Sequence, residues 1–328
     1  MWPYAISACA NRRRSTAASA NLDPKADVAR FGPGLRCSSW ASTQPISPVR
    51  LCPGIQPPTL PQCQTASKGL NSSQAALGSV HGVFLASRGV TGPKYVIEGP
   101  NGLAQAVDKP IRVDWDNMKL DCFDRLALKS YNTAVSGQAA VFCTIELHKG
   151  HPFDPAVVVS VEADVFQDAY DFMGGGRFGP KKNVPTKEDA DHTLPYPLAV
   201  ALLDGDVQPA QLESSRIAKP DVQDLLQKVT IRPDAGFTAR YPAEVPSRVT
   251  VRLKSGESFT HEVSAYPGFS SRPFTWDEIE AKFDKLATDH TAAKSRRDIK
   301  DAVRSLESLQ VADLMEPLGR VKAPSPQR

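Results

Sequence analysis

A sharp change in composition near residue 66 divides this sequence into two kinds of chain. Residues 1–66 hold nine of the 28 prolines and four of the six cysteines. They carry seven Lys and Arg but only two Asp, a net charge of +5, whereas the rest of the chain carries 32 basic and 34 acidic side chains, a net charge of −2. Because proline interrupts helices and strands, and no hydrophobic period runs through this segment, we predict a disordered or aberrant leader without a packed core.

Two other interpretations of the leader remain open. Its first 22 residues contain three consecutive arginines, several Ser and Ala, and no acidic residue, which is the composition of an organelle transit peptide. Its four cysteines would favour a disulfide framework in an oxidising compartment. Since the rest of the chain has only two cysteines and no secretion signal is evident, we expect a cytoplasmic protein, with a mitochondrial location as the alternative.

The whole chain has an ordinary globular composition. It has 328 residues, of which 23% are charged and 41% hydrophobic, with a net charge of +3. At about 150 residues per domain, this length corresponds to one large or two modest domains. An excess of three basic residues without a basic run argues against nucleic-acid binding, and no apolar run approaches the roughly 18 residues that cross a bilayer. We therefore expect neither a nucleic-acid nor a membrane partner.

Regular hydrophobic patterns begin near residue 69 and predict an α+β fold. The residue pattern predicts a small-residue helix at 71–89, a helix at 138–147, a Val-rich strand at 156–166 and a hairpin with a Ser-Gly turn at 249–264. Four more helices are expected: one capped by Thr186 and regular only after Pro195 and Pro197, one at 221–229 capped by Asp221, one starting at the capping box Thr275–Glu278, and one at 295–310.

Few residues suggest chemistry by their type and position alone. The six histidines are scattered and no Cys-x-x-Cys pair occurs, so no metal site is predicted. Lys68 precedes the small-residue helix, and Lys129 lies among apolar and hydroxyl-bearing neighbours, where an ammonium could stabilise an anionic substrate. The motif DADHTLPYP brings His192 and Tyr196 together as polar pocket residues, although a helix cap with a hydrogen-bonded histidine fits equally well.

Two long motifs in the sequence are similar to a known family. They are LASRGVTGPKYVIEGPNG at 85–102 and TKEDADHTLPYPLAVALLDGDV at 186–207. Both resemble the MmgE/PrpD family, which includes 2-methylcitrate dehydratase and cis-aconitate decarboxylase. The likeness extends more loosely to LKSYNTAVSGQAAV, VFQDAYDFMGGG and YPGFSSRP.

The resemblance implies a discontinuous helical domain and a smaller α+β lid, with the active site between them. In this sequence it implies a partial all-helical domain at 67–125 and 267–318, a lid at 126–266 and a disordered tail at 319–328. In the family, a first half that supplies a catalytic aspartate and histidines would precede Lys68. Because the leader contains no histidine, we expect an N-terminally truncated homologue with impaired activity.

The resemblance also implies roles for individual residues. Lys68 and Lys129 match the family's active-site lysines, and Tyr170 matches a lid tyrosine that faces the substrate. Ser136 and Gln138 follow the lid lysine and are expected at the substrate. Many members have a histidine where Ser136 stands, so one acid/base group is replaced here.

The implied activity is that of a hydro-lyase that dehydrates 2-methylcitrate or a similar tricarboxylate, as in propionate catabolism, without a metal or organic cofactor. Lys68 and Lys129 would stabilise the developing negative charge, while His192 or Tyr196 would orient polar groups. One alternative is a catalytically inactive homologue that acts through association, with itself as a homodimer or with an intact homologue. The other is a cis-aconitate decarboxylase-like enzyme.

Overall fold

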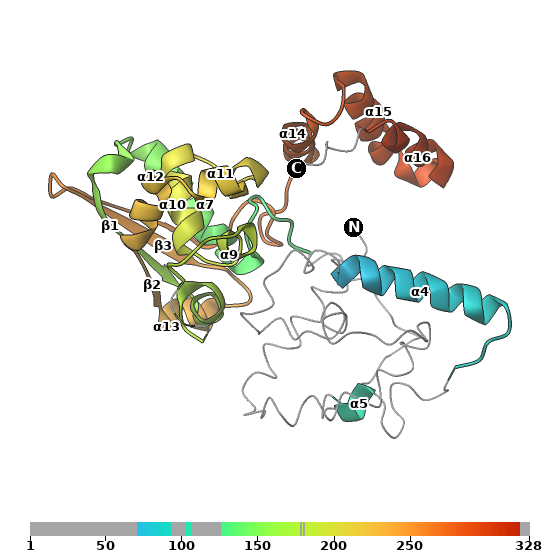
Figure 1. Ribbon diagram of the computed structural model, residues 1–328, viewed down its shortest axis with the longest axis horizontal. Helices are drawn as coiled ribbons and strands as arrows, with labels where there is room; N and C mark the ends of the chain where they lie inside the picture. Colours follow the sequence, from blue (N-terminus) through green and yellow to red (C-terminus); the bar gives the residue numbers. More distant parts are fainter. Residues whose placement is uncertain (1–70, 93–102, 107–125, 178, 180, 322–328) are drawn as a thin grey trace. The chain divides into compact units, whose positions relative to one another are not determined.

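The computed structural model describes residues 71–92, 103–106, 126–177, 179 and 181–321 (Figure 1). The leader, most of the predicted helical piece at 67–125 and the end of the tail lie outside the described residues. The chain forms two compact units. The first contains Tyr131–Ser264, and the second consists of Ala127–Ser130 and Ala265–Arg328. The mixture of helices and a sheet confirms the predicted α+β class.

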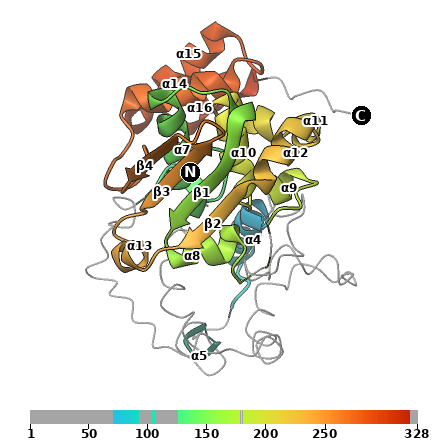
Figure 2. The ribbon, with the colours of Figure 1, turned by 90° about the vertical axis from the view of Figure 1, so that its left-hand side faces the viewer.

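A four-stranded sheet in the order β2-β1-β3-β4 forms the centre of the Tyr131–Ser264 unit (Figure 2). Its strands are β1 (Val158–Val165), β2 (Val229–Pro233), β3 (Ser247–Leu253) and β4 (Ser258–Val263). β1 pairs with β2 in parallel, whereas β1 with β3 and β3 with β4 are antiparallel. The predicted Val-rich strand and the hairpin are thus confirmed, and Gly256 takes a φ of 90° in the turn between β3 and β4.

Helices cover one face of this sheet (Figure 2). α7 (Gln138–Gly150) packs on β3 and β4, and α10 (Pro195–Asp204) packs on α7, β2 and α12 (Pro220–Gln227). The valines at alternate positions of β3 are buried toward the helices, while arginine and threonine alternate with them, as the two-residue period of a strand requires. The strand period therefore places the apolar core between the sheet and these helices.

Shorter elements connect the sheet and the covering helices. Among the described residues of this unit, they are η4 (Val135–Gly137), η5 (Pro155–Val157), α8 (Gln167–Ala169), η6 (Tyr170–Gly174), α9 (Lys187–Ala190), η7 (Pro209–Leu212), α11 (Ser214–Ile217) and α13 (Ala235–Arg240). The helices α8, after β1, and α13, after β2, were not predicted from the sequence, because neither is long enough to show a period.

Two predicted helix starts were wrong. α10 begins at Pro195 itself and includes Pro197, rather than starting after them. The first residues of a helix need no backbone N–H donor, so proline is tolerated there. α12 begins at Pro220 with Lys219 as its N-cap, and Asp221 lies in the first turn instead of capping it. Thr186 does cap a helix, but that helix is the four-residue α9, separate from α10.

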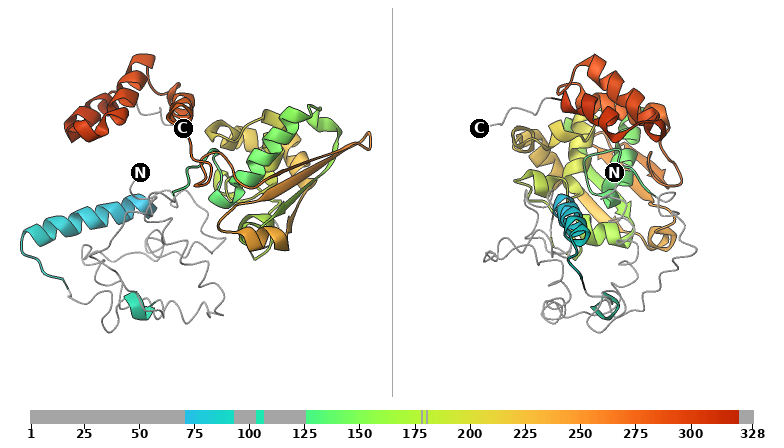
Figure 3. Two further views of the ribbon diagram at one scale, coloured as in Figure 1. Left: turned by 180° about the vertical axis from the view of Figure 1, so that it is seen from behind. Right: turned by 90° about the vertical axis from the view of Figure 1, so that its right-hand side faces the viewer.

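The second unit contains three helices, α14 (Trp276–Ala287), α15 (Ala293–Arg304) and α16 (Val311–Gly319) (Figure 3). The predicted capping box is confirmed, because Thr275 accepts a hydrogen bond from the Glu278 amide and Glu278 accepts one from the Thr275 amide. The helix predicted at 295–310 is present as α15, but its predicted end at residue 310 was wrong. α15 stops near Ser305, whose hydroxyl bonds to the Asp301 carbonyl, and the short η8 (Leu306–Ser308) leads into α16.

Acidic side chains on α14 pair with basic ones on α15. Asp284 Oδ1 lies 3.1 Å from Arg296 Nε, and Asp284 Oδ2 lies 2.7 Å from Lys300 Nζ. Glu280 accepts from Arg304 one turn further along α15. Because the pairs recur along both helices, they fix how α14 and α15 lie against each other.

Two helices precede these units in the chain, α4 (Asn71–Ser87) and α5 (Leu103–Ala106). α4 confirms the predicted small-residue helix, and Gly89, with a φ of 84°, follows its end as expected. Among the described helices, none is long and apolar enough to cross a membrane.

Candidate functional site

Lys129 lies in a short irregular segment of the second unit, Ala127–Ser130, which is tied to the chain that follows Ala265. The Leu128 amide donates to the Gly268 carbonyl at 2.7 Å, and the Ser130 hydroxyl donates to the Pro267 carbonyl at 2.5 Å. The ammonium of Lys282, on α14, donates to the Lys129 carbonyl. The Lys129 backbone is therefore held on both sides, while its side chain is exposed.

Gly268 explains how closely the two segments approach. Its φ is 96°, a conformation that side-chain-bearing residues rarely adopt. A Cβ at this position would stand 2.5 Å from the Leu128 carbonyl oxygen and 2.6 Å from a ring carbon of Phe274. The bond from Leu128 to Gly268 thus depends on the absence of a side chain there.

Lys68, the other predicted catalytic lysine, lies outside the described residues. Its convergence with Lys129 therefore stays a prediction, as does the contact of either lysine with a substrate.

Gln138 occupies the start of α7 and is completely buried. Its Oε1 accepts from the Tyr131 amide at 2.9 Å, and its Nε2 donates to the carbonyls of Tyr131 and Thr133 at 2.9 and 3.2 Å. A buried amide with these partners fixes the path of residues 131–133. The structure therefore gives Gln138 a positioning role, and its predicted contact with substrate is untested.

Ser136 lies two residues before Gln138, in η4, and is half-buried. Its hydroxyl donates to the sulfur of Met173 at 3.3 Å. Since a thioether is a weak acceptor, this hydroxyl could exchange its partner for a stronger one, such as a carboxylate oxygen.

Tyr170 begins the π-helical turn η6 and is half-buried. Its ring lies against the glycines that follow it: a Cβ on Gly174 or on Gly176 would each come within 2.9 Å of a ring carbon. Gly175 between them has a φ of 102°. The glycine run at 174–176 therefore makes room for the Tyr170 ring and fixes its place.

His192 is 8% exposed and lies just after the capped helix α9. Its Nδ1 lies 3.0 Å from the Glu188 carbonyl oxygen and also contacts the carboxylate of Asp191. Because both partners accept hydrogen bonds, Nδ1 carries the proton. The ring stands edge-on to Phe172, with centroids 6.0 Å apart. Of the two interpretations of this motif, the helix cap with a hydrogen-bonded histidine describes what is observed, and substrate contact stays a prediction.

Backbone hydrogen bonds bring three of these segments together. The Ala134 amide donates to the Asp191 carbonyl at 3.0 Å, and the Leu194 amide donates to the Met173 carbonyl at 3.0 Å. The loop before α7, the η6 turn and the loop after α9 therefore meet at one place in the Tyr131–Ser264 unit. The segments that meet here include Ser136, Tyr170 and His192.

Tyr196 is completely buried in α10. Its hydroxyl donates to the Gln211 carbonyl, and burial raises the pKa of Tyr196 to about 12. The hydroxyl thus stays protonated and links α10 to η7, so the structure gives it a packing role. Its predicted role at the substrate has no support in the described contacts.

Two half-buried lysines were missed by the sequence analysis. They are Lys181, in the loop before α9, and Lys282, on α14. Burial lowers the pKa of each below its ordinary value of 10.5. Lys282 stands among the polar positions of an amphipathic helix, where the pattern predicts a solvated side chain, so periodicity gave no signal.

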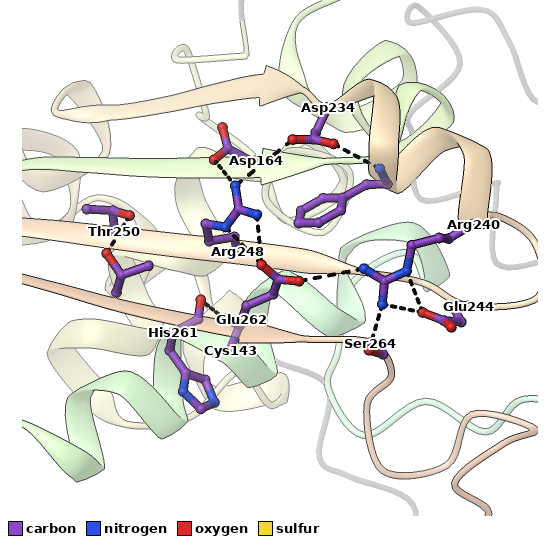
Figure 4. A network of polar contacts seen from close by, with 12 residues as sticks. Cys143, Asp164, Asp234, Arg240, Glu244, Arg248, Thr250, His261, Glu262 and Ser264 are labelled. Carbon is purple, nitrogen blue, oxygen red and sulfur yellow. Dashed lines mark hydrogen bonds and ion pairs between the residues drawn. The ribbon is translucent and has the colours of Figure 1, made fainter.

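The polar face of the sheet carries a network of paired charges (Figure 4). Arg248 Nε donates to Glu262 at 2.9 Å, and Arg248 Nη1 lies 3.5 Å from Asp164. Arg240 Nη1 lies 3.6 Å from the second oxygen of Glu262. Because these guanidinium groups already face carboxylates from the neighbouring strands, we interpret the network as a link between strands rather than a site for an anion.

The described part of the chain contains no cluster of three or more His, Cys, Asp or Glu side chains that could hold a metal ion. The buried thiol of Cys143 donates to the His261 carbonyl at 2.9 Å, and burial raises its pKa to about 12. A thiol so rarely ionised is a poor nucleophile. Cys143 is therefore a core residue.

The described residues thus form a mixed α+β unit and a helical unit. Residues 131–308 match the family model described as the MmgE/PrpD C-terminal domain, which is more than half of the chain. The chain therefore belongs to the MmgE/PrpD family.

Curated relatives include a cis-aconitate decarboxylase from Homo sapiens, 26% identical over 148 residues, and one from Mus musculus, 25% identical over 146 residues. Each match covers 43% of this chain, but only 29% of the human and 28% of the mouse protein. The chain thus spans less than a third of the length of these relatives.

Proposed function

We propose that this chain binds a citrate-like tricarboxylate and serves a lyase reaction on that acid. The observation that carries this proposal is membership of the MmgE/PrpD family, together with Lys129 in the segment that leads directly into the matched region. Lys129 contacts one carboxylate of the acid. The hydroxyls of Ser136 and Tyr170 and the ring of His192 supply polar contacts from the lid.

The first candidate reaction is dehydration of 2-methylcitrate. A C–H bond beside a carboxylate loses its proton, the C–O bond of the hydroxyl breaks, and the leaving hydroxide takes a proton to become water. The electron pair from the C–H bond forms the new C=C bond. Negative charge builds up beside a carboxylate during this step, and a nearby ammonium lowers its energy.

The second candidate reaction is decarboxylation of cis-aconitate, which the names of the two relatives favour. Here a C–C bond to a carboxylate breaks, carbon dioxide leaves, and the carbon that keeps the electron pair takes a proton. The same ammonium stabilises the same kind of charge. Neither reaction gains or loses electrons overall, in keeping with the expectation of no redox cofactor.

One assay separates the two reactions. The purified full chain is incubated with 2-methylcitrate, citrate and cis-aconitate while ultraviolet absorbance and carbon dioxide are followed. Dehydration raises the absorbance of a C=C bond conjugated to a carboxylate and releases no carbon dioxide, whereas decarboxylation releases it. Either activity should be lost in Lys129→Ala. Absence of both turnover and tricarboxylate binding would contradict the proposal.

A non-catalytic role through association is a further candidate, favoured by α4. Four large apolar side chains at i, i+3, i+6 and i+7 are exposed along one side of the helix: Leu77 by 65%, Val80 by 54%, Val83 by 68% and Phe84 by 57%. An apolar stripe on one side of a helix normally packs against another element, so a second copy would cover it in a homodimer. Sedimentation analysis should then give twice the mass of the 35.5 kDa chain, and Val83→Glu should restore the monomer. A monomeric wild-type chain would contradict this role.

A further inference from the structure

Lys282 has an unusual environment for a lysine on a solvent-facing helix. Its side chain is half-buried, and burial lowers its pKa. Among the described residues no carboxylate forms an ion pair with it. Its ammonium instead donates to the backbone carbonyl of Lys129.

The acidic groups nearest to Lys282 on the same helix have partners elsewhere. Glu278 closes the capping box with Thr275, while Glu280 and Asp284 pair with basic residues of α15. Glu280 and Asp284 are each two residues from Lys282, which places them on another side of the helix. The ammonium of Lys282 therefore serves the Lys129 segment rather than an ion pair within α14.

A charged donor on this carbonyl has a definite mechanical consequence. Hydrogen bonds with one ionised partner are roughly twice as strong as neutral ones. The bond from Lys282 holds the peptide group that follows Lys129, while the bonds from Leu128 to Gly268 and from Ser130 to Pro267 hold the residues on either side of it. Because the following peptide group and both neighbouring residues are held, the direction in which the Lys129 side chain leaves the backbone is restricted.

We propose that Lys282 is a positioning residue that aims the Lys129 side chain at its carboxylate ligand. The inference rests on the proposed function, since it takes Lys129 as the residue that contacts the acid. It assigns no contact with the ligand to Lys282. A misplacement of about 1 Å in a binding or catalytic group can cost about 100-fold, so loss of this bond should weaken the Lys129 contact severalfold.

The test is a double-mutant cycle on the full chain, with tricarballylate as the ligand. This saturated tricarboxylate has neither a hydroxyl group to lose nor a C=C bond, so binding is measured without turnover. We expect Lys282→Met to raise the dissociation constant about tenfold, and Lys282→Arg, which keeps a charged donor, to stay within threefold of the wild type. In a Lys129→Ala background, Lys282→Met should have no further effect.

A matched control is Lys294→Met, because Lys294 is exposed on α15 and its pair with Asp298, at 3.7 Å, is worth little. It should leave binding unchanged. Far-UV circular dichroism verifies the fold of each variant, and Lys282→Gln, which keeps a neutral donor, replaces Lys282→Met in the cycle if that variant does not fold.

The outcomes are distinct. If Lys129→Ala binds as the wild type does, the proposed function fails. If Lys129→Ala weakens binding but Lys282→Met does not, positioning by Lys282 is refuted while the proposed function stands. Additive effects of the two substitutions would also refute it, because they would show that Lys282 acts independently of Lys129.

Discussion

Replacing Gln138 with methionine tests whether the start of α7 fixes the chain that follows Lys129. Methionine has nearly the same length and volume as glutamine but cannot make the three hydrogen bonds that Gln138 forms with the backbone of Tyr131 and Thr133. Each such bond contributes about 1 kcal/mol net, so the loss should be about 3 kcal/mol. With a slope of about 2 kcal/mol per molar urea, the unfolding midpoint should fall by about 1.5 M.

Urea unfolding of the full chain, monitored by hydrogen exchange of the α7 amides, measures this loss within the Tyr131–Ser264 unit. Gln227→Met is a matched control, because Gln227 is exposed and its amide nitrogen makes one hydrogen bond, 3.0 Å from the Lys182 carbonyl oxygen. The control should change the free energy of unfolding by less than about 0.5 kcal/mol. Equal small effects of the two substitutions would refute the positioning role of Gln138.

Three further predictions concern stability. Gly268→Ala should lower the free energy of unfolding by about 3 kcal/mol, because a Cβ would clash with a backbone oxygen at 2.5 Å. Gly256→Ala, at a φ of 90° but with open space around it, should lower it by only about 1 kcal/mol. Thermal unfolding that ranks the two variants the other way would contradict the packing described. The hydrogen bond from Lys300 holds the pKa of Asp284 below 3.8. The stability that this ion pair contributes is therefore present above pH 3.8 and lost as the pH falls through the lowered pKa. Asp284→Asn should flatten the acid side of a curve of stability against pH, and an unchanged curve would argue against the pair. Tyr196→Phe should lower stability by about 1 kcal/mol in urea unfolding, and no change would mean that its buried hydroxyl bond contributes nothing.

Where a residue pattern repeats or a cap is local, the sequence was sufficient to predict structure. The Val-rich run of β1, the alternating valines of β3 and the Ser-Gly turn were read correctly, because composition, period and turn chemistry act over a few residues. The capping box at Thr275 was also predictable, since both hydrogen bonds lie within four residues. The start of α10 was missed because proline was taken only as a helix breaker.

The candidate site was harder to predict, because its geometry depends on contacts between distant parts of the chain. Gln138 and Tyr196 were chosen as polar residues in a family motif, but burial and their backbone partners appear only in the folded chain. Lys282, in contrast, was not chosen from the sequence, because its partner is distant along the chain. The bond to Lys129 joins residues 153 positions apart, and no local pattern encodes it.

The affinity of the full chain for tricarballylate, measured by calorimetry for the wild type and for Lys129→Ala, tests the central claim most directly. A hydrogen bond between an ammonium and a carboxylate contributes about 1.5–3 kcal/mol, which corresponds to roughly a 10- to 100-fold change in the dissociation constant. We predict that the wild-type chain binds and that Lys129→Ala binds at least tenfold more weakly. Equal affinities, or no binding by the wild type, would contradict the assignment of Lys129 as a carboxylate ligand.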